Sequence, residues 1–208
     1  MRLLLASKSP RRRQLLAELG YPVEFISLDV DEHVPADTPA DATAELLARR
    51  KAEACPQETI TDDTILVAAD TVVVLQDKVL GKPADRQEAL AMLRALSGNS
   101  HSVYTGVCLR TSAKTISFTE KTDVHFRHLG ESELEYYVDN YRPYDKAGAY
   151  GIQEWIGMVG ISRIEGCYYN VMGLPVARVY ESIRSCMPSS SDTSPLSSIS
   201  RTSSPTRS

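Results

Sequence analysis

The strongest pattern in the chain is a long apolar run that dominates the stretch from Ile65 to Pro83. Its β-branched residues predict a β-strand buried on both faces, interrupted only by Asp70 and Thr71. A buried carboxylate without a partner is costly, so we expect Asp70 to lie where the strand meets a cleft, beside a cation, a metal ion or water. Lys82 is one candidate partner. The alternative is that Asp70 merely caps a neighbouring turn.

Shorter periodic segments predict further strands and helices before and after this run in the sequence. Alternating or apolar runs predict strands over residues 3–6, 23–28, 102–110, 115–126 and 159–164. Apolar positions spaced three and four apart predict helices over residues 10–19, 41–54, 86–97, 131–141 and 175–183. Asp41 and Asp85 are the expected N-caps of two of these helices. The mixture predicts one α/β domain over residues 1–187.

The start of the first predicted helix carries an unusual charge pattern. Ser9 suits the N-cap and Pro10 the first helical position, yet Arg11, Arg12 and Arg13 then fill the first turn. The helix dipole already presents positive potential there, so acidic residues are the usual choice. An external anion such as phosphate, bound by backbone N–H groups, serine hydroxyls and guanidinium groups, resolves the conflict. The alternative is a solvated basic helix start.

Two further segments carry candidate chemistry. The loop from Asp29 to Asp41 is acidic, and its carboxylates can ligate a divalent cation, although such loops are usually only solvated. The segment from Tyr141 to Gln153 contains glycine and alanine around Lys146, which indicates tight turning or close approach. The amide of Gln153 can accept from N3–H of uracil or thymine while donating to an adjacent carbonyl. A loop glutamine bonded to backbone is the alternative.

Composition narrows the class of protein. The chain has 208 residues, 42% hydrophobic and 24% charged, and a formal net charge of −4, which argues against a general nucleic-acid binder but not against a nucleotide substrate. Four cysteines without CxxC spacing indicate neither a zinc site nor a disulfide framework. No signal peptide or membrane span is predicted, so we expect a soluble cytoplasmic protein. Residues 188–208, rich in Ser, Thr, Pro and Arg, are expected to be a disordered tail.

Six ordered motifs together resemble the Maf family of nucleoside triphosphate pyrophosphatases. They are LASKSPRRRQLL at 5–16, AADTVV at 68–73, GKP at 81–83, LSGNSHSVYTGV at 96–107, DKAGAYGIQ at 145–153 and YNVMGLP at 169–175. The resemblance implies an α/β, Maf/ITPase-like fold with a mixed sheet, flanking helices and two lobes about a central cleft, often as a homodimer. It also implies hydrolysis of a nucleoside triphosphate to monophosphate and pyrophosphate with Mg²⁺ or Mn²⁺.

The resemblance carries roles onto individual residues. Asp70 matches the catalytic carboxylate, which is the proton acceptor that activates water. Arg11, Thr71 and Gln153 match the positions that mark the dTTP/UTP-hydrolysing branch, against a branch acting on 7-methyl-GTP. The polar positions lining the triphosphate pocket are matched by Ser7, Ser9, Arg12, Lys51, Lys82 and Lys146. Glu32 matches the loop acid of the family and, with Asp70, is the expected metal ligand.

The resulting hypothesis is hydrolysis of dTTP and UTP, with CTP or modified pyrimidine nucleotides as further candidates, in the house-cleaning of nucleotide pools. Cationic side chains and the metal neutralise the triphosphate, and Asp70 orients or deprotonates water for attack at the α-phosphorus. A role of Asp70 mainly as a metal ligand is the alternative. Two other functions stay open: a pyrophosphatase for 7-methyl-GTP or another modified nucleotide, and a non-enzymatic nucleotide-sensing regulator of cell division.

Overall fold

A mixed β-sheet forms the centre of the molecule in the computed structural model, which describes residues 1–35 and 37–187. The predicted tail at 188–208 lies outside the described residues. The strands are β1 (Arg2–Ala6), β2 (Val23–Ile26), β3 (Thr64–Leu75), β4 (Lys78–Leu80), β5 (Ser100–Arg110), β6 (Thr115–Phe126) and β7 (Ile161–Glu165). Their order is β2-β1-β3-β5-β6-β7, and β4 pairs with β3. β1 runs parallel to β2 and β3, whereas β3, β5, β6 and β7 pair antiparallel in turn. The expected mixed sheet is confirmed.

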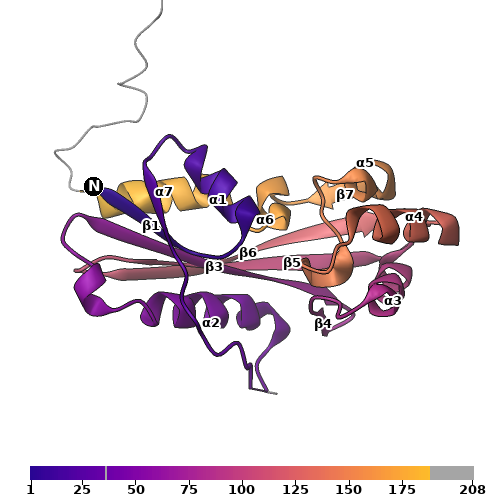
Figure 1. Cartoon of the computed structure of the whole chain (residues 1–208), viewed down its shortest axis with the longest axis horizontal. Coiled ribbons are helices and arrows are strands. Elements are labelled where there is room, and N and C mark those ends of the chain that lie inside the picture. The colour runs from indigo at the N-terminus through magenta and orange to yellow at the C-terminus, as the bar shows by residue number, and fades with distance from the viewer. Residues whose placement is uncertain (36, 188–208) are drawn as a thin grey trace, which may run out of the picture.

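Helices cover both faces of this sheet (Figure 1). They are α1 (Pro10–Ala17), α2 (Ala40–Glu53), α3 (Arg86–Leu96), α4 (Glu131–Tyr141), α5 (Trp155–Gly160), α6 (Tyr168–Met172) and α7 (Val176–Cys186), with 3-10 turns η1 (Gln57–Thr59) and η2 (Ala147–Ala149). α2 lies on one face, α1 and α7 lie on the other, and α3, α4 and α5 gather at the far end of the long strands (Figure 1). No helix in the described part of the chain is both long and apolar enough to cross a membrane.

β3 is buried on both faces, as its apolar run predicts. Leu66 and Ala68 pack in one core with Ala48 of α2, whereas Ile65 and Val67 pack in another core with α1 and α7. Alternating side chains of a strand point to opposite faces, so a strand covered by helices on both sides needs apolar residues throughout.

The second half of β3 belongs to a different core. Val73 and Leu75 pack with α3 and α4, at the other end of the strand. Asp70 and Thr71 are the two consecutive half-buried residues between these cores. The strand therefore passes from one apolar group to another, and its polar pair lies at the junction, in agreement with the expected two lobes about a cleft.

Close packing of α2 on β5 fixes the position of one side of this junction. A Cβ atom on Gly106 would lie 2.2 Å from the backbone of Ala44 in α2, far inside van der Waals contact. Only glycine permits this approach of helix to strand. The contact sets the height of α2 above the sheet and therefore the reach of side chains from its last turn.

Two local predictions are wrong, and one short helix was missed. Asp41 lies in the first turn of α2, which begins at Ala40 after Pro39, so it complements the helix dipole instead of capping the helix. The strand predicted from residue 159 begins at Ile161, because residues 155–160 form helix α5. Helix α6 was not predicted at all. Helices of five or six residues contain too few turns for a periodic pattern to distinguish them from a strand or a loop.

Candidate functional site

A cavity of about 810 Å³ opens at the polar junction of β3. This volume lies within the usual range for small-ligand sites. All residues selected from the sequence as site candidates line it: Ser7, Ser9, Arg11, Arg12, Glu32, Lys51, Asp70, Thr71, Lys82, Lys146 and Gln153. They come from α1 and the loop before it, the acidic loop, α2, β3, the turn after β4 and the segment before α5.

Asp70 has an ammonium group as its partner. Nζ of Lys51 lies 2.5 Å from Oδ1 of Asp70 and 2.8 Å from Oε1 of Glu32. The side chains of Lys51 and Asp70 are each 16% exposed, so the pair lies at the edge of the interior and opens to the cavity. The hydrogen bond from Lys51 lowers the pKa of Glu32, and the positive charges of Lys82 and Arg12 act in the same direction.

This arrangement selects one of the two interpretations of Asp70 that the sequence left open. The carboxylate accepts a hydrogen bond from a cation in a cleft and does not cap a turn. Its ion-pair partner is Lys51 rather than Lys82, which is exposed on the turn after β4 and lines the same cavity. Helix α2 packs directly on the sheet and brings Lys51 to β3, a placement that helical periodicity alone does not reveal.

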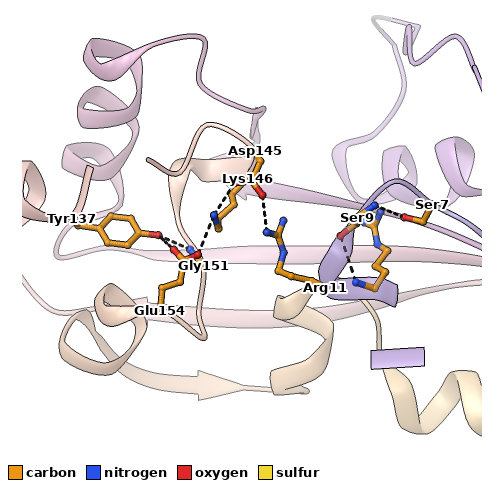
Figure 2. Close-up of polar contacts among 9 residues, drawn as sticks. Ser7, Ser9, Arg11, Tyr137, Asp145, Lys146, Gly151 and Glu154 are labelled. Atoms are coloured by element: carbon orange, nitrogen blue, oxygen red, sulfur yellow. Dashed lines mark hydrogen bonds and ion pairs between the residues drawn. The ribbon is translucent and has the colours of Figure 1, made fainter. Parts of the chain in front are cut away.

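The N-terminus of α1 has the predicted cap. The side chain of Ser9 accepts from the N–H of Arg12 at 3.5 Å, and the N–H of Ser9 donates to Oγ of Ser7 at 3.1 Å (Figure 2). Nη1 of Arg11 donates to Oδ2 of Asp145 at 2.8 Å, which joins α1 to the segment on the other side of the cavity. Arg13 points elsewhere and donates to the backbone oxygen of Ser7.

The guanidinium of Arg12 is held from two directions. Its Nε donates to the backbone oxygen of Gly173, and its Nη2 donates to Oγ1 of Thr71, both at 2.8 Å. Oγ1 of Thr71 lies 2.9 Å from Oγ1 of Thr105, which in turn donates to the backbone oxygen of Asn170. Burial lowers the pKa of Arg12, although nearby Asp70 opposes that effect. The guanidinium is therefore fixed in orientation before any ligand arrives.

The segment from Tyr141 to Gln153 turns tightly, as its glycines indicated. Gly148 has φ of +69°, and a Cβ atom there would lie 3.1 Å from the side chain of Val73. Lys146 contacts Oδ1 of Asp145 at 2.7 Å and Oε1 of Glu154 at 3.0 Å. Burial would raise the pKa of Asp145, but hydrogen bonds from Lys146 and Arg11 outweigh it and lower the pKa.

Sequence reasoning missed several residues that hold this site together. Thr105, Asn170 and Glu154 each contact a candidate residue or its support. Thr105 belongs to an alternating strand and Asn170 to an unpredicted helix, so neither stood out by pattern. Glu154 follows Gln153 directly, and a carboxylate at the end of a glycine-rich segment was a signal that could have been followed.

The carboxylates of Glu32 and Asp70 suit a metal ion that is also bound by substrate phosphates and water. Within residues 1–35 and 37–187, no group of three His, Cys, Asp or Glu side chains is placed to hold a metal ion. Glu32 and Asp70 nevertheless converge on one ammonium group, so both lie within reach of a single cation. Mg²⁺ commonly binds through one or two carboxylates, with substrate phosphates and water as its other ligands. The residues present suit that mode and do not form a closed protein cage.

The fold and the cavity define an α/β protein whose central cleft combines several cationic side chains with a carboxylate pair, an arrangement suited to a phosphorylated ligand. The chain belongs to the family described as Maf-like protein, whose model matches residues 2–186.

Relatives in this family cover nearly all of the described chain. A dTTP/UTP pyrophosphatase of Parabacteroides distasonis is 49% identical over 185 residues, which is 88% of this chain and 95% of the relative. A dTTP/UTP pyrophosphatase of Flavobacterium johnsoniae is 43% identical over 180 residues, with 86% and 92% covered. Among solved structures, the Staphylococcus aureus Ham1 protein matches with a TM-score of 0.42 and 12% identity over 61% of this chain and 72% of that chain.

Proposed function

We propose that this protein hydrolyses dTTP and UTP to the nucleoside monophosphate and pyrophosphate. The observation that carries the proposal is the meeting of Asp70, paired with Lys51, with five further cationic side chains and Gln153 in one cavity. The cations are Lys8, Arg11, Arg12, Lys82 and Lys146. The names of the similar relatives support the same substrates.

The cationic side chains bind the triphosphate. Arg12 presents a guanidinium whose orientation is already set by Thr71 and Gly173, so little conformational entropy is lost when it binds phosphate oxygens. Arg11 and Lys146 both contact Asp145, and phosphate oxygens compete with that carboxylate for them. The positive charges around the cavity offset the negative charge that concentrates on the leaving pyrophosphate.

Asp70 activates the attacking water. Its carboxylate accepts a proton from water while the water oxygen forms a bond to the α-phosphorus. The bond from that phosphorus to the oxygen bridging the α- and β-phosphates breaks, and the electron pair leaves with pyrophosphate. The hydrogen bond from Lys51 holds the Asp70 carboxylate in one orientation for this step. When bound, Mg²⁺ or Mn²⁺ would be held by Asp70 and Glu32 and would supply further neutralisation of the triphosphate.

Gln153 selects the base. Its amide accepts from N3–H and donates to a neighbouring carbonyl of uracil or thymine, whereas cytosine presents an acceptor at N3. A site built on such hydrogen bonds discriminates because the wrong base leaves polar groups unpaired.

The test is to incubate the protein with Mg²⁺ or Mn²⁺ and dTTP, UTP, CTP or 7-methyl-GTP, and to measure pyrophosphate and monophosphate. We expect release from dTTP and UTP and loss of at least about a hundredfold in Asp70→Asn. Asp77→Asn, which changes an exposed acid in the turn after β3, is the matched control. Release mainly from 7-methyl-GTP would overturn the substrate assignment, and release from none would favour a nucleotide-binding regulator. Omission of the metal tests the cofactor proposal and should abolish release.

We also propose a homodimer in the cytoplasm. The homodimer proposal rests on the family resemblance, and the location proposal rests on the four cysteines, all of which are free thiols. Analytical ultracentrifugation at micromolar concentration should give twice the mass of the chain, and fractionation of cells should recover the protein with cytoplasmic enzymes. A single-chain mass, or recovery with another fraction, would contradict the respective proposal.

A further inference from the structure

A chain of five side chains joins the interior of α4 to the cavity (Figure 2). The hydroxyl of Tyr137 donates to Oε2 of Glu154, whose Oε1 contacts Nζ of Lys146 at 3.0 Å. Lys146 also contacts Oδ1 of Asp145 at 2.7 Å, and Oδ2 of the same carboxylate accepts from Arg11. A helix of the outer layer is thereby connected to cations on both walls of the cavity.

Two members of this chain do not line the cavity themselves. Tyr137 is fully buried in the core formed by α3 and α4, and Glu154 is not among the residues that line the cavity. Lys146 and Arg11, by contrast, line the cavity. Tyr137 and Glu154 can therefore influence a ligand only through the residues that they hold.

The charged groups in this connection are largely buried and therefore depend on one another. The side chain of Lys146 is only 9% exposed and that of Glu154 only 19%. A charge in such a place needs a partner, because its hydration has been lost. Glu154 supplies one of the two carboxylate contacts of Lys146, and the hydroxyl of Tyr137 satisfies the other oxygen of Glu154. Burial and the hydrogen bond to Glu154 raise the pKa of Tyr137, so its hydroxyl stays protonated and remains a donor.

The same pair also fixes the backbone beside Gln153. The hydroxyl of Tyr137 accepts from the N–H of Gly151 at 3.0 Å. A Cβ atom on Gly151 would lie 2.9 Å from Cδ of Glu154 and 3.1 Å from Nε2 of Gln153. The carboxylate of Glu154 and the amide of Gln153 therefore both lie close over the same glycine, whose N–H is held by Tyr137.

We propose that Tyr137 and Glu154 are positioning residues that set how Gln153 and Lys146 meet the nucleotide, and so determine base selectivity without contacting the base. This proposal rests on the proposed hydrolysis of dTTP and UTP. Tyr137 controls mainly Gln153, through Gly151 and the carboxylate of Glu154. Glu154 controls in addition the charge balance of Lys146.

Two conservative variants separate these effects. Tyr137→Phe keeps the ring and removes only the hydroxyl, and we expect the ratio of kcat/KM for UTP over CTP to fall about fivefold. Glu154→Gln keeps the shape and removes the charge, and we expect KM for UTP to rise about tenfold, equivalent to 1.4 kcal/mol. In both variants kcat for UTP should change far less than KM, since Asp70 and Lys51 are untouched.

Tyr136→Phe is the matched control, because it removes the same hydroxyl group one residue earlier on α4. Tyr136 is 48% exposed, and its ring packs edge-on against Trp155 with centroids 4.9 Å apart. We expect the control to keep both the UTP/CTP ratio and KM. A role limited to stability would lower activity on UTP and CTP alike and leave their ratio unchanged, so the ratio distinguishes positioning from folding.

Thermal unfolding of each variant accompanies the kinetics. If Tyr137→Phe does not fold, Gly151→Ala supplies the second variant, since its added methyl group presses on both Glu154 and Gln153 while Tyr137 stays intact. A UTP/CTP ratio and KM indistinguishable from the Tyr136→Phe control overturn this inference alone. A wild-type protein that releases no pyrophosphate from any nucleotide overturns the proposed function, and the inference with it.

Discussion

Replacing Lys51 by methionine removes the ammonium group that two carboxylates share. Methionine keeps the length and apolar stem of the side chain, so the lost interactions are mainly the contacts of Nζ with Asp70 at 2.5 Å and Glu32 at 2.8 Å. Breaking a fully buried ion pair costs about 3–5 kcal/mol. Breaking an exposed pair costs at most about 1 kcal/mol. Because Lys51 and Asp70 are 16% exposed and Glu32 is 59% exposed, we expect a loss of about 2 kcal/mol in the free energy of unfolding at pH 7.

Urea unfolding of the wild type, Lys51→Met, Asp70→Asn and the double variant measures this loss as a double-mutant cycle. Asp70→Asn should cost less in the Lys51→Met background than in the wild type, because its charged partner is already gone. Lys51→Arg, which keeps the charge, should recover part of the stability. A loss below about 0.5 kcal/mol, or strict additivity of the two substitutions, would refute the view that the ammonium stabilises the cleft.

Acid should reduce the difference between the wild type and Lys51→Met. Lys51 lowers the pKa of Glu32 in the folded protein below its ordinary value of 4.5. A carboxyl with a lowered pKa contributes stability above that ordinary value and loses it as the pH falls through its folded pKa. The unfolding free energies of the two proteins should therefore draw closer as the pH falls below 4.5, because the part that Glu32 contributes is lost. A difference that stays constant from pH 7 to pH 3 would contradict this assignment.

Three further predictions concern the support of the site. Thr105→Val removes a fully buried hydroxyl between two polar partners and should lower the unfolding free energy by about 1–3 kcal/mol in urea titrations. An unchanged unfolding free energy would contradict a stabilising role of this hydrogen-bond chain. Gly106→Ala places a methyl group 2.2 Å from the backbone of α2, so we expect this variant not to fold. Gly81→Ala, whose added methyl group has nothing within 4 Å, should fold normally. Circular dichroism of the two variants measures the difference. Burial lowers the pKa of His101 to about 4, so stability should fall as the pH drops from 6.5 toward 4, by up to about 3 kcal/mol. His101→Gln should lose that part of the slope, and an unchanged slope would refute it.

Much of the fold could be predicted because its long elements have recognisable local sequence patterns. The start of β3, the Ser9–Pro10 helix start and the helix at residues 131–141 were predicted close to their observed positions. Burial on both faces dictates an uninterrupted apolar run, and capping dictates the residue types at helix starts. The short helices α5 and α6 could not be predicted, since their positions are decided by contacts with segments far away in the sequence.

The site was predictable as a set of residues but not as a set of contacts. Motifs supplied the members, and a single cavity contains all of them. The partner of Asp70 was beyond local reasoning, because Lys51 lies 19 residues earlier on a helix whose height above β5 depends on the missing side chain of Gly106. Tyr137 lies in the helix predicted over residues 131–141, and only the folded chain brings its hydroxyl to Glu154.

The sequence by itself therefore determined the class of structure, the conflict of charge at Arg11 to Arg13 and the need of Asp70 for a partner, because these follow from burial, dipole and period within one element. Only the tertiary structure decided which cation meets which carboxylate. Lys51 bridges Asp70 and Glu32, and Asp145 forms ion pairs with both Arg11 and Lys146. The physical reason is that ion pairing acts over a few ångströms, and distances of that size between separate elements are set by how helices and strands pack.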